Sequence, residues 1–417
     1  MVRPAQVPDG VMVVRTGLRI GAVAACLLAA ALIAAARPAH AAPCTIEIRP
    51  GMELLAGALT QTDWIETRSP VSDGNEYYRA LAAFFRPYRH HRAIQLLNNL
   101  AGLGFTYELP PSFICHLGPL PDLGLKYEYA DDLIWAAGNR ETLEDLRTAL
   151  RDLAAESNFA AFAERWQSSY DEWVARAADC PSGPTVAWLE EFFGTGAAEY
   201  HIILSPAMFP SGGYAASVTA ASGERAVFAV IREPGRSISD PEIPTGTQLA
   251  SLALHEWGHS FVNPLVAARR NQTAALTTVY WRTMRAMKRQ GYGSLEAFLD
   301  EQILRAVTSL AAGDLLGPEA LAEEANYHET HGFYLTRPVI ELLREYQAER
   351  GTYRTFADFL PRLLEGLMPY RVVIPPWAVV AAMVTIGALA WSRLRRALDE
   401  RADRQRRWLN RQPWIWQ

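Results

Sequence analysis

Lysine is almost absent from this sequence, since Lys126 and Lys288 are the only lysines among 40 basic residues. Cysteine is scarce as well: there are four, and no C-x-x-C pair, which excludes a cysteine-ligated zinc site and a disulfide-rich scaffold. The net charge of -5 lacks the basic excess that marks nucleic-acid-binding proteins. The preference for arginine, together with abundant alanine, suggests a GC-rich bacterial genome.

Two apolar stretches predict targeting and membrane segments at the ends of the chain. Arg15 and Arg19 precede the apolar run Ile20–Ala36, and Ala39-His40-Ala41 follows as an A-x-A cleavage site, so residues 1–41 are expected to be a signal peptide. Val372–Trp391 carries no charge and is followed by arginines, which predicts a transmembrane helix at 372–392 and a basic cytoplasmic tail at 393–417. We therefore expect a protein that is secreted across the cytoplasmic membrane and anchored to it, with the region between outside the cytoplasm.

Hydrophobic periodicity predicts an α+β fold that is mostly helical, in two parts: a helical part at 42–184 and a second domain at 185–370. Helices are expected at Met52–Leu59, Tyr77–Phe85, His90–Leu103, Arg140–Ala155, Phe159–Ala178, Trp188–Phe193, Thr247–Phe261, Gln272–Arg289, Leu295–Ala311, Glu319–His331 and Arg337–Arg350, with an irregular connection at Gly104–Pro121. Thr45–Arg49 and Tyr200–Ser205 are expected strands, and Gly213–Thr219 pairs with Arg225–Ile231 as a hairpin. Three cysteines, Cys44, Cys115 and Cys180, follow the signal segment, and the sequence leaves their pairing open.

The stretch with the clearest chemistry is L-A-L-H-E-W-G-H-S-F-V-N-P at Leu252–Pro264. His255 and His259 are four residues apart, so on a helix both imidazoles lie on one face and can hold one metal ion. Glu256 is placed to act on a water in an open coordination position of that ion. H-E-x-x-H on a helix is the signature of zinc metallohydrolases, and Pro264 is expected to end the helix near Asn263.

A catalytic zinc site needs a third protein ligand besides the two histidines. The extended H-E-x-x-H-x-x-G-x-x-H pattern fails, because Val262 and Leu265 stand at its later positions. Glu301 is the favoured ligand, because it is a carboxylate on an otherwise apolar helix, although an ion pair with Arg305 is the alternative role for it. The other candidates from the later helices are Glu296, Asp300, Glu323, Glu324, His328 and His331.

The string H-E-W-G-H-S-F-V-N-P, followed by D-E-Q-I-L-R-A-V at Asp300–Val307, resembles the bacterial family described as domain of unknown function 4932. In layout it is similar to the glutamate-zincins, or gluzincin-like zinc metallopeptidases. The resemblance extends from about Tyr77 to Tyr370, and it implies a zincin-like domain with a small sheet beside the H-E-x-x-H helix. It also implies His255, His259 and Glu301 as zinc ligands and Glu256 as general base. One departure is Arg305, where thermolysin-type enzymes carry an acidic residue.

These patterns predict a membrane-anchored zinc metallopeptidase that acts on a peptide or protein substrate outside the cytoplasm. Zinc would lower the pKa of a water to about 7, and Glu256 would accept its proton. His331 and Tyr334 are candidates for stabilising the oxyanion, and Ser260 and Asn263 for orienting the ligands. Two alternatives remain: a membrane-tethered binding module without activity, and a zinc hydrolase of a non-peptide amide such as a cell-wall component.

Overall fold

The computed structural model describes residues 42–69, 74–208, 210, 212–232, 241–372 and 376–409. The strands are β1 (Cys44–Glu47), β2 (Glu199–Leu204), β3 (Gly213–Thr219) and β4 (Arg225–Ile231). The helices before β2 are α2 (Pro50–Leu59), α3 (Asp63–Glu66), α4 (Glu76–Phe85), α5 (Arg92–Leu103), α6 (Leu109–Cys115), α7 (Asp131–Ala136), α8 (Arg140–Glu156), α9 (Phe159–Ala177) and α10 (Ser182–Phe193). Those after β4 are α11 (Gly246–Ala267), α12 (Arg270–Ala274), α13 (Thr277–Trp281), α14 (Met284–Arg289), α15 (Leu295–Leu316), α16 (Pro318–Thr330), α17 (Thr336–Ala348), α18 (Phe356–Gly366) and α19 (Pro376–Leu409). The expected signal segment, 1–41, lies outside the described residues.

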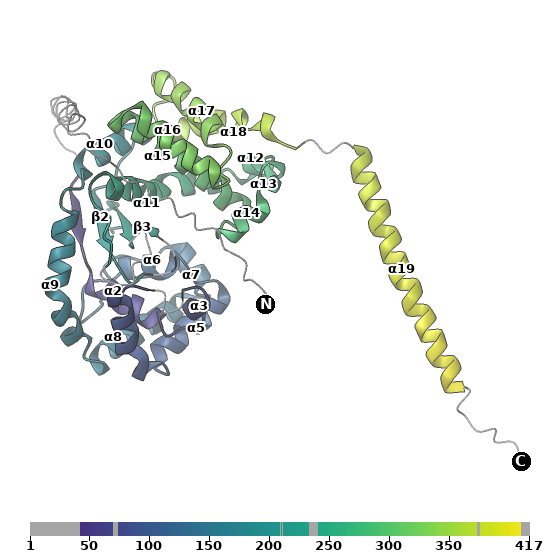
Figure 1. Cartoon of the computed structure of the whole chain (residues 1–417), viewed down its shortest axis with the longest axis horizontal. Helices are drawn as coiled ribbons and strands as arrows, with labels where there is room; N and C mark the ends of the chain where they lie inside the picture. The colour runs from purple at the N-terminus through teal and green to yellow at the C-terminus, as the bar shows by residue number, and fades with distance from the viewer. Residues whose placement is uncertain are drawn as a thin grey trace, which may run out of the picture.

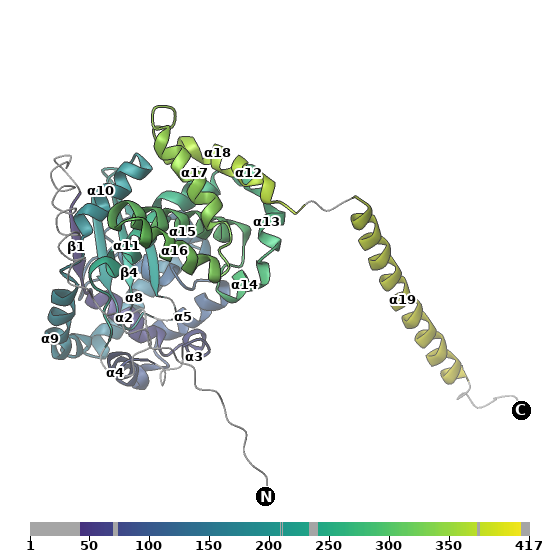
Figure 2. The same ribbon diagram turned by 45° about the horizontal axis from the view of Figure 1, so that its top comes forward.

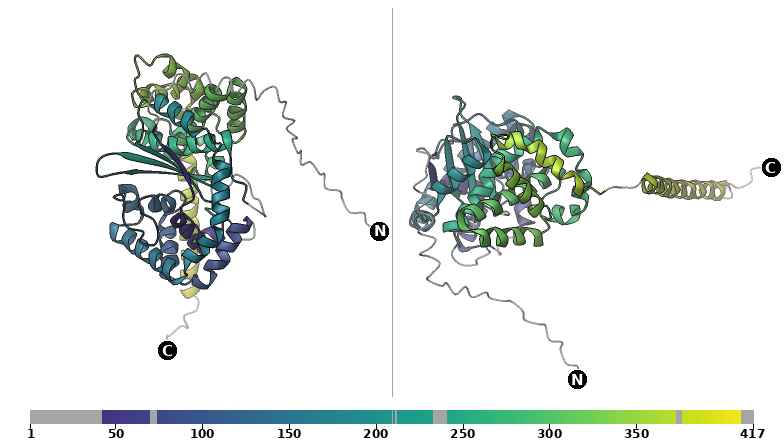
Figure 3. Two further views of the ribbon diagram at one scale, coloured as in Figure 1. Left: turned by 90° about the vertical axis from the view of Figure 1, so that its left-hand side faces the viewer. Right: turned by 90° about the horizontal axis from the view of Figure 1, so that it is seen from above.

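The four strands form one mixed sheet in the order β1-β2-β4-β3. β1 and β4 each run parallel to β2, whereas β3 pairs with β4 in the antiparallel direction and is an edge strand. The sheet lies between two helical layers, with α2 to α8 below it and α11 to α18 above it in the view of Figure 1. The left view of Figure 3 shows the strands between these layers. The expectation of a mostly helical α+β fold with a small sheet beside the H-E-x-x-H helix is confirmed.

The burial of each strand follows from its sequence. β4 reads R-A-V-F-A-V-I and is buried from Ala226 to Ile231, as expected for a strand covered on both faces. β3 alternates between buried and partly exposed residues, so that Tyr214, Ala216 and Val218 point into the core and the residues between them face outward. β3 therefore has one buried face and one partly exposed face, and it lies at the edge of the sheet.

Three local predictions are wrong. Pro264 does not end α11, which continues to Ala267. Proline lacks the N–H that would bond the Ser260 carbonyl one turn earlier, and the Arg225 guanidinium donates to that carbonyl instead, at 3.2 Å. The 104–121 connection contains α6, in which two prolines lie in the first turn, where a helix tolerates them. The single helix expected at 272–289 is divided into α12, α13 and α14.

The expected transmembrane helix is corrected by the structure. Among the described parts of the chain, no helix is long enough and apolar enough to cross a membrane. The helix at this place is α19, which extends away from the other elements in Figure 1. The charged residues of this helix begin at Arg393, midway along it, and continue almost to its end.

A buried carboxyl group below the sheet gives a first testable prediction. Glu53 of α2 is fully buried, and Ser205 at the end of β2 donates a hydrogen bond to its Oε1. Burial raises the pKa of Glu53 from 4.5 to about 7. Between these two pKa values the folded state holds a proton that the unfolded chain releases. The free energy of unfolding should therefore fall by about 3 kcal/mol as the pH rises from about 4.5 to about 7.

Glu53→Gln should remove this contribution, so that its unfolding free energy depends less on pH between about 4.5 and 7 than that of the wild type. Urea unfolding at several pH values measures the difference. The exposed Glu76 of α4 supplies the control, and Glu76→Gln should keep the slope of the wild type. Equal slopes for wild type and Glu53→Gln would show that Glu53 is not protonated in the fold.

Candidate metal centre

The H-E-x-x-H segment lies in the middle of α11, between the sheet and α15. Trp257 is fully buried; it packs edge-on against Tyr200, and its Nε1 donates to the His201 carbonyl of β2 at 3.1 Å. This side of α11 is thereby fixed to the sheet. Gly258 faces Leu304 of α15, whose side chain occupies the space that a Cβ would need. The sequence between the two histidines thus holds α11 to the sheet and lets α15 approach closely.

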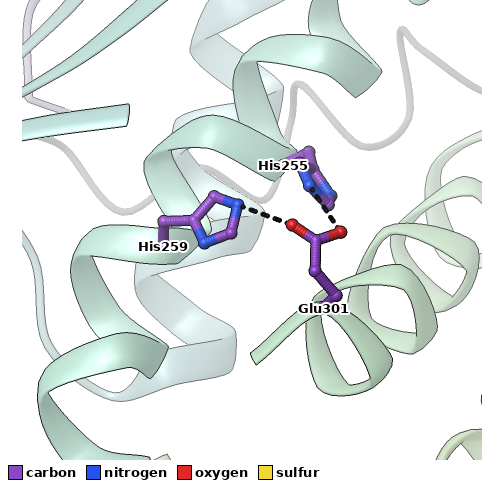
Figure 4. Close-up of side chains that lie close together, drawn as sticks. All are labelled: His255, His259 and Glu301. Carbon is purple, nitrogen blue, oxygen red and sulfur yellow. Dashed lines mark ion pairs between the residues drawn. The ribbon is translucent and has the colours of Figure 1, made fainter. Parts of the chain in front are cut away.

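That approach brings His255, His259 and Glu301 together. The two imidazoles project from successive turns of α11 toward the Glu301 carboxylate of α15 (Figure 4). His255 Nε2 lies 3.6 Å from Glu301 Oε2, and His259 Nε2 lies 3.4 Å from Glu301 Oε1. The three residues form a group whose ligand atoms all lie within 4.8 Å of one another. Figure 2 shows α15 and α16 next to α11 on the upper side of the sheet.

The geometry and the donor set fit a zinc ion. Ligand atoms about 2.0–2.1 Å from a tetrahedral zinc are separated by about 3.3 Å, close to the two measured distances. Two imidazole nitrogens and one carboxylate oxygen are a known catalytic zinc set. Glu301 Oε2 is buried and makes no well-aligned hydrogen bond, and its near neighbours are Arg305 NH2 at 2.9 Å and His255 Nε2 at 3.6 Å. The same three side chains are the ligands that the sequence favoured.

Neighbouring side chains orient the group. His259 Nδ1 lies 3.1 Å from Asn263 Oδ1, one turn further along α11, so an Nδ1–H can donate to the amide and leave Nε2 free for a metal. Arg305 NH2 lies 2.9 Å from Glu301 Oε2, and its guanidinium stacks over the Phe333 ring at 4.0 Å. Arg305 also donates to the Tyr292 hydroxyl at 3.1 Å. The arginine that departs from the thermolysin-type pattern thus holds the carboxylate.

The charges of the group follow from burial and from Glu301. Burial lowers the pKa of His255 to about 4, so this imidazole is neutral at pH 7. Burial opposes the charge of His259 as well, but its contact with Glu301 raises its pKa to about 9. Against the effect of burial, Arg305 and the two histidines hold the pKa of Glu301 well below its usual range. Without a metal, the cluster is therefore a paired carboxylate and imidazolium, and a metal ion could bind only if the proton on His259 were released.

Glu256 lies beside this cluster and faces the edge strand. It is 8% exposed, and burial raises its pKa from 4.5 to about 7. Its carboxylate fills the space where a Cβ on Gly213 of β3 would lie. A carboxyl group with a pKa near neutral can both accept and return a proton, which is the property that a general base requires.

A cavity of about 2600 Å³ runs across the cluster. Its walls include the partly exposed face of β3, the cluster on α11 and α15, and Glu108, which immediately precedes α6 in the lower layer. Tyr292 and Asp300 also line it, and burial raises the pKa of Asp300 to about 8. The sequence pointed to neither Tyr292 nor Glu108, because both come from connections outside any periodic pattern and meet the cluster only in the fold.

The structure does not bring the expected oxyanion residues to the cluster. His331 is exposed and its Nδ1 donates to the Tyr327 carbonyl at 2.7 Å, while Tyr334 donates to the Val279 carbonyl at 2.7 Å. Neither residue lines the cavity. Ser260 lines it, but its buried hydroxyl forms no hydrogen bond with any residue that the structure describes.

The other candidate ligands stand apart from the metal-type group, which comprises only three residues among those described. His328 Nε2 lies 3.1 Å from Glu324 Oε2 on the same helix, α16. The cavity is also lined by three candidates that are not part of this group: Glu296, Asp300 and Glu323. Cys44, Cys115 and Cys180 are free thiols.

Comparison with known proteins identifies a family but no individual relative. A family model described as "Domain of unknown function (DUF4932)" matches residues 45–365. Neither curated proteins nor solved structures yield a match. The matched segment begins earlier than the resemblance near residue 77 indicated, and it extends from β1 to α18, including every residue of the candidate metal centre. The chain therefore belongs to the DUF4932 family.

Proposed function

We propose that this protein is a zinc-dependent metallopeptidase with a gluzincin-like arrangement of its site. The observation that carries the proposal is the meeting of His255, His259 and Glu301 beside Glu256. This is the constellation expected of an H-E-x-x-H hydrolase with a glutamate as third ligand. We also propose that the reaction takes place outside the cytoplasm, on the strength of the targeting pattern at 20–41, which lies outside the described residues.

The metal would be held by His255, His259 and Glu301. Zinc at these ligands supplies Lewis acidity and brings the ionisation of water close to neutral pH. Asn263 fixes the ring of His259, and Arg305 fixes the carboxylate of Glu301. Arg305 also offsets the negative charge of Glu301, so that less of this charge would reduce the Lewis acidity of a bound metal.

Glu256 is the proposed general base. Its carboxylate lies between the histidines and the edge strand, where it can take the proton of the water that attacks a peptide carbonyl. It then passes this proton to the leaving amine. Burial favours both steps, because it raises the pKa of Glu256 to about 7, where the group can accept and release a proton at neutral pH.

The edge strand β3 is the proposed site for the substrate backbone. Its residues from Gly213 to Ser217 line the cavity, and the strand is paired with β4 on one side only. An extended peptide can add to such an edge through main-chain hydrogen bonds, with little dependence on its sequence. A peptide bound there passes directly over Glu256.

Tyr292 replaces His331 and Tyr334 as the proposed donor to the oxyanion. Its hydroxyl accepts a hydrogen bond from Arg305, lines the cavity, and keeps its own proton free to donate. Burial raises the pKa of Tyr292, so the hydroxyl is protonated at neutral pH. A tyrosine in this state can stabilise a developing negative charge.

Two adjacent glycines provide a matched test of this arrangement. A Cβ on Gly213 would overlap the Glu256 carboxylate, whereas a Cβ on Gly212 would meet nothing within 4 Å. Gly213→Ala should therefore displace the base and lower kcat for a peptide substrate by about tenfold to 100-fold, while Gly212→Ala should keep the wild-type value. Steady-state kinetics on a quenched fluorescent peptide measures both. Equal kcat values would refute the placement of Glu256 against β3, and the absence of hydrolysis by the wild type would refute the peptidase proposal.

A further inference from the structure

Asp300 is a buried acidic residue beside the candidate metal centre, and no hydrogen bond or ion pair joins it to another of the described side chains. It precedes Glu301 on α15, is 6% exposed and lines the cavity. Its Oδ1 is buried and makes no hydrogen bond. A carboxylate removed from water without a partner is costly, so its presence in a cavity wall indicates a ligand that completes it.

A second carboxylate increases this cost. Glu296 lies one helical turn before Asp300 on α15 and lines the same cavity. Like charges at this spacing destabilise a helix. The described ion pair of Glu296 is a long one, with the exposed Arg270 at 3.7 Å. The two side chains therefore offer their carboxyl oxygens to a cationic group in the cavity.

The arginines that line the cavity are already engaged. Arg305 contacts Glu301, Tyr292 and the ring of Phe333. Arg225 donates to the carbonyls of Ser260 and Gly196. Neither has a described contact with Asp300 or Glu296. The His259 imidazole attracts the charge of Asp300 but is itself in contact with Glu301, so a cation in direct contact with Asp300 is expected from outside the described chain.

We propose that Asp300 and Glu296 form a subsite for a lysine or arginine side chain of the substrate, next to the peptide bond that is cut. This inference rests on the proposed peptidase function and names its substrate class. Asp300 is adjacent in sequence to Glu301, so a side chain bound there belongs to a residue flanking the reacting bond. The buried Oδ1 accepts a hydrogen bond from the cationic head group, and Glu296 adds its charge at the partly exposed rim.

A metal ion fits this subsite less well than a basic side chain does. A calcium ion takes six to eight oxygen ligands, and Asp300 with Glu296 supplies only two carboxylates. Among the described residues, groups of three or more metal-type side chains are limited to His255, His259 and Glu301. A long cationic side chain needs only one or two acceptors, and its methylenes can pack along the cavity wall.

The test measures binding instead of turnover, so that it remains distinct from the peptidase proposal. The full chain carrying Glu256→Gln and loaded with zinc is titrated against two fluorescent peptides that differ only in a central lysine or acetyl-lysine. We expect the lysine peptide to bind at least about tenfold more tightly in fluorescence anisotropy. Asp300→Asn should abolish this preference, and Glu323→Gln, at an exposed position of the same cavity, should retain it.

Equal affinities for the two peptides, no measurable binding of either, or a preference that survives Asp300→Asn would overturn the subsite. Equilibrium dialysis with calcium would also overturn it by revealing a metal site that disappears in Asp300→Asn. Selective binding of the lysine peptide by a chain that hydrolyses no peptide would leave the subsite standing and refute the peptidase proposal. Peptide hydrolysis by the wild type, together with equal binding of the lysine and acetyl-lysine peptides, would refute the subsite and leave the peptidase proposal standing.

Discussion

Glu256→Gln should lower kcat/KM for peptide hydrolysis by about 10²- to 10⁴-fold, the range that a positioned general base contributes. Glutamine keeps the volume of the side chain beside Gly213 but cannot accept a proton from water. Because Glu256 is not one of the three grouped ligands, the variant should retain its zinc. Steady-state kinetics and metal analysis of the same preparation measure the two properties together.

Glu323→Gln is the control for this experiment, since Glu323 lies in the same cavity at an exposed position and belongs to no part of the proposed mechanism. It should show wild-type kinetics. Wild-type activity in Glu256→Gln would exclude Glu256 as the base. Loss of zinc together with activity would instead give Glu256 a role in holding the metal.

Glu301→Gln should weaken zinc binding by at least about 100-fold. The substitution removes the anionic ligand and leaves Arg305 buried beside a neutral amide, which further disfavours a cation at this position. Competition with a chromophoric chelator measures the affinity. Because the metal is required for the proposed reaction, peptide hydrolysis should fall with it at limiting zinc.

Glu324→Gln is the matched variant on α16. Glu324 lines the cavity and pairs with His328, and both were candidates for the third ligand. It should bind zinc as the wild type does. Strong zinc binding in Glu301→Gln together with weak binding in Glu324→Gln would transfer the third ligand to the Glu324 and His328 pair.

The local part of the candidate site could be predicted from the sequence, because it depends on helix geometry. Four-residue spacing places His255 and His259 on one face wherever the segment is helical. Glu301 could be selected from several acids because it interrupts an apolar helix. A carboxylate buried there is costly unless it has a partner. The strands could also be predicted from local patterns. The alternation of β3 indicates one covered face, and the continuous apolar run of β4 indicates two.

The rest of the site depends on contacts between distant segments. Tyr292 and Glu108 lie in short connections, and nothing in their own neighbourhood indicates that they face the cluster. The continuation of α11 through Pro264 depends on Arg225, a residue of β4 that supplies the donor that proline lacks. His331 and Tyr334 were selected by residue type alone, and their hydrogen bonds go to backbone carbonyls outside the cavity.

We have proposed that this chain cleaves peptide bonds with a zinc ion held by His255, His259 and Glu301. The most direct measurement is hydrolysis of an unfolded protein by the full chain as purified, after removal of metal with a chelator, and after return of about one equivalent of zinc. We expect activity in the first state, its loss in the second and its recovery in the third. Activity that resists chelation, or no hydrolysis in any of the three states, would contradict the claim.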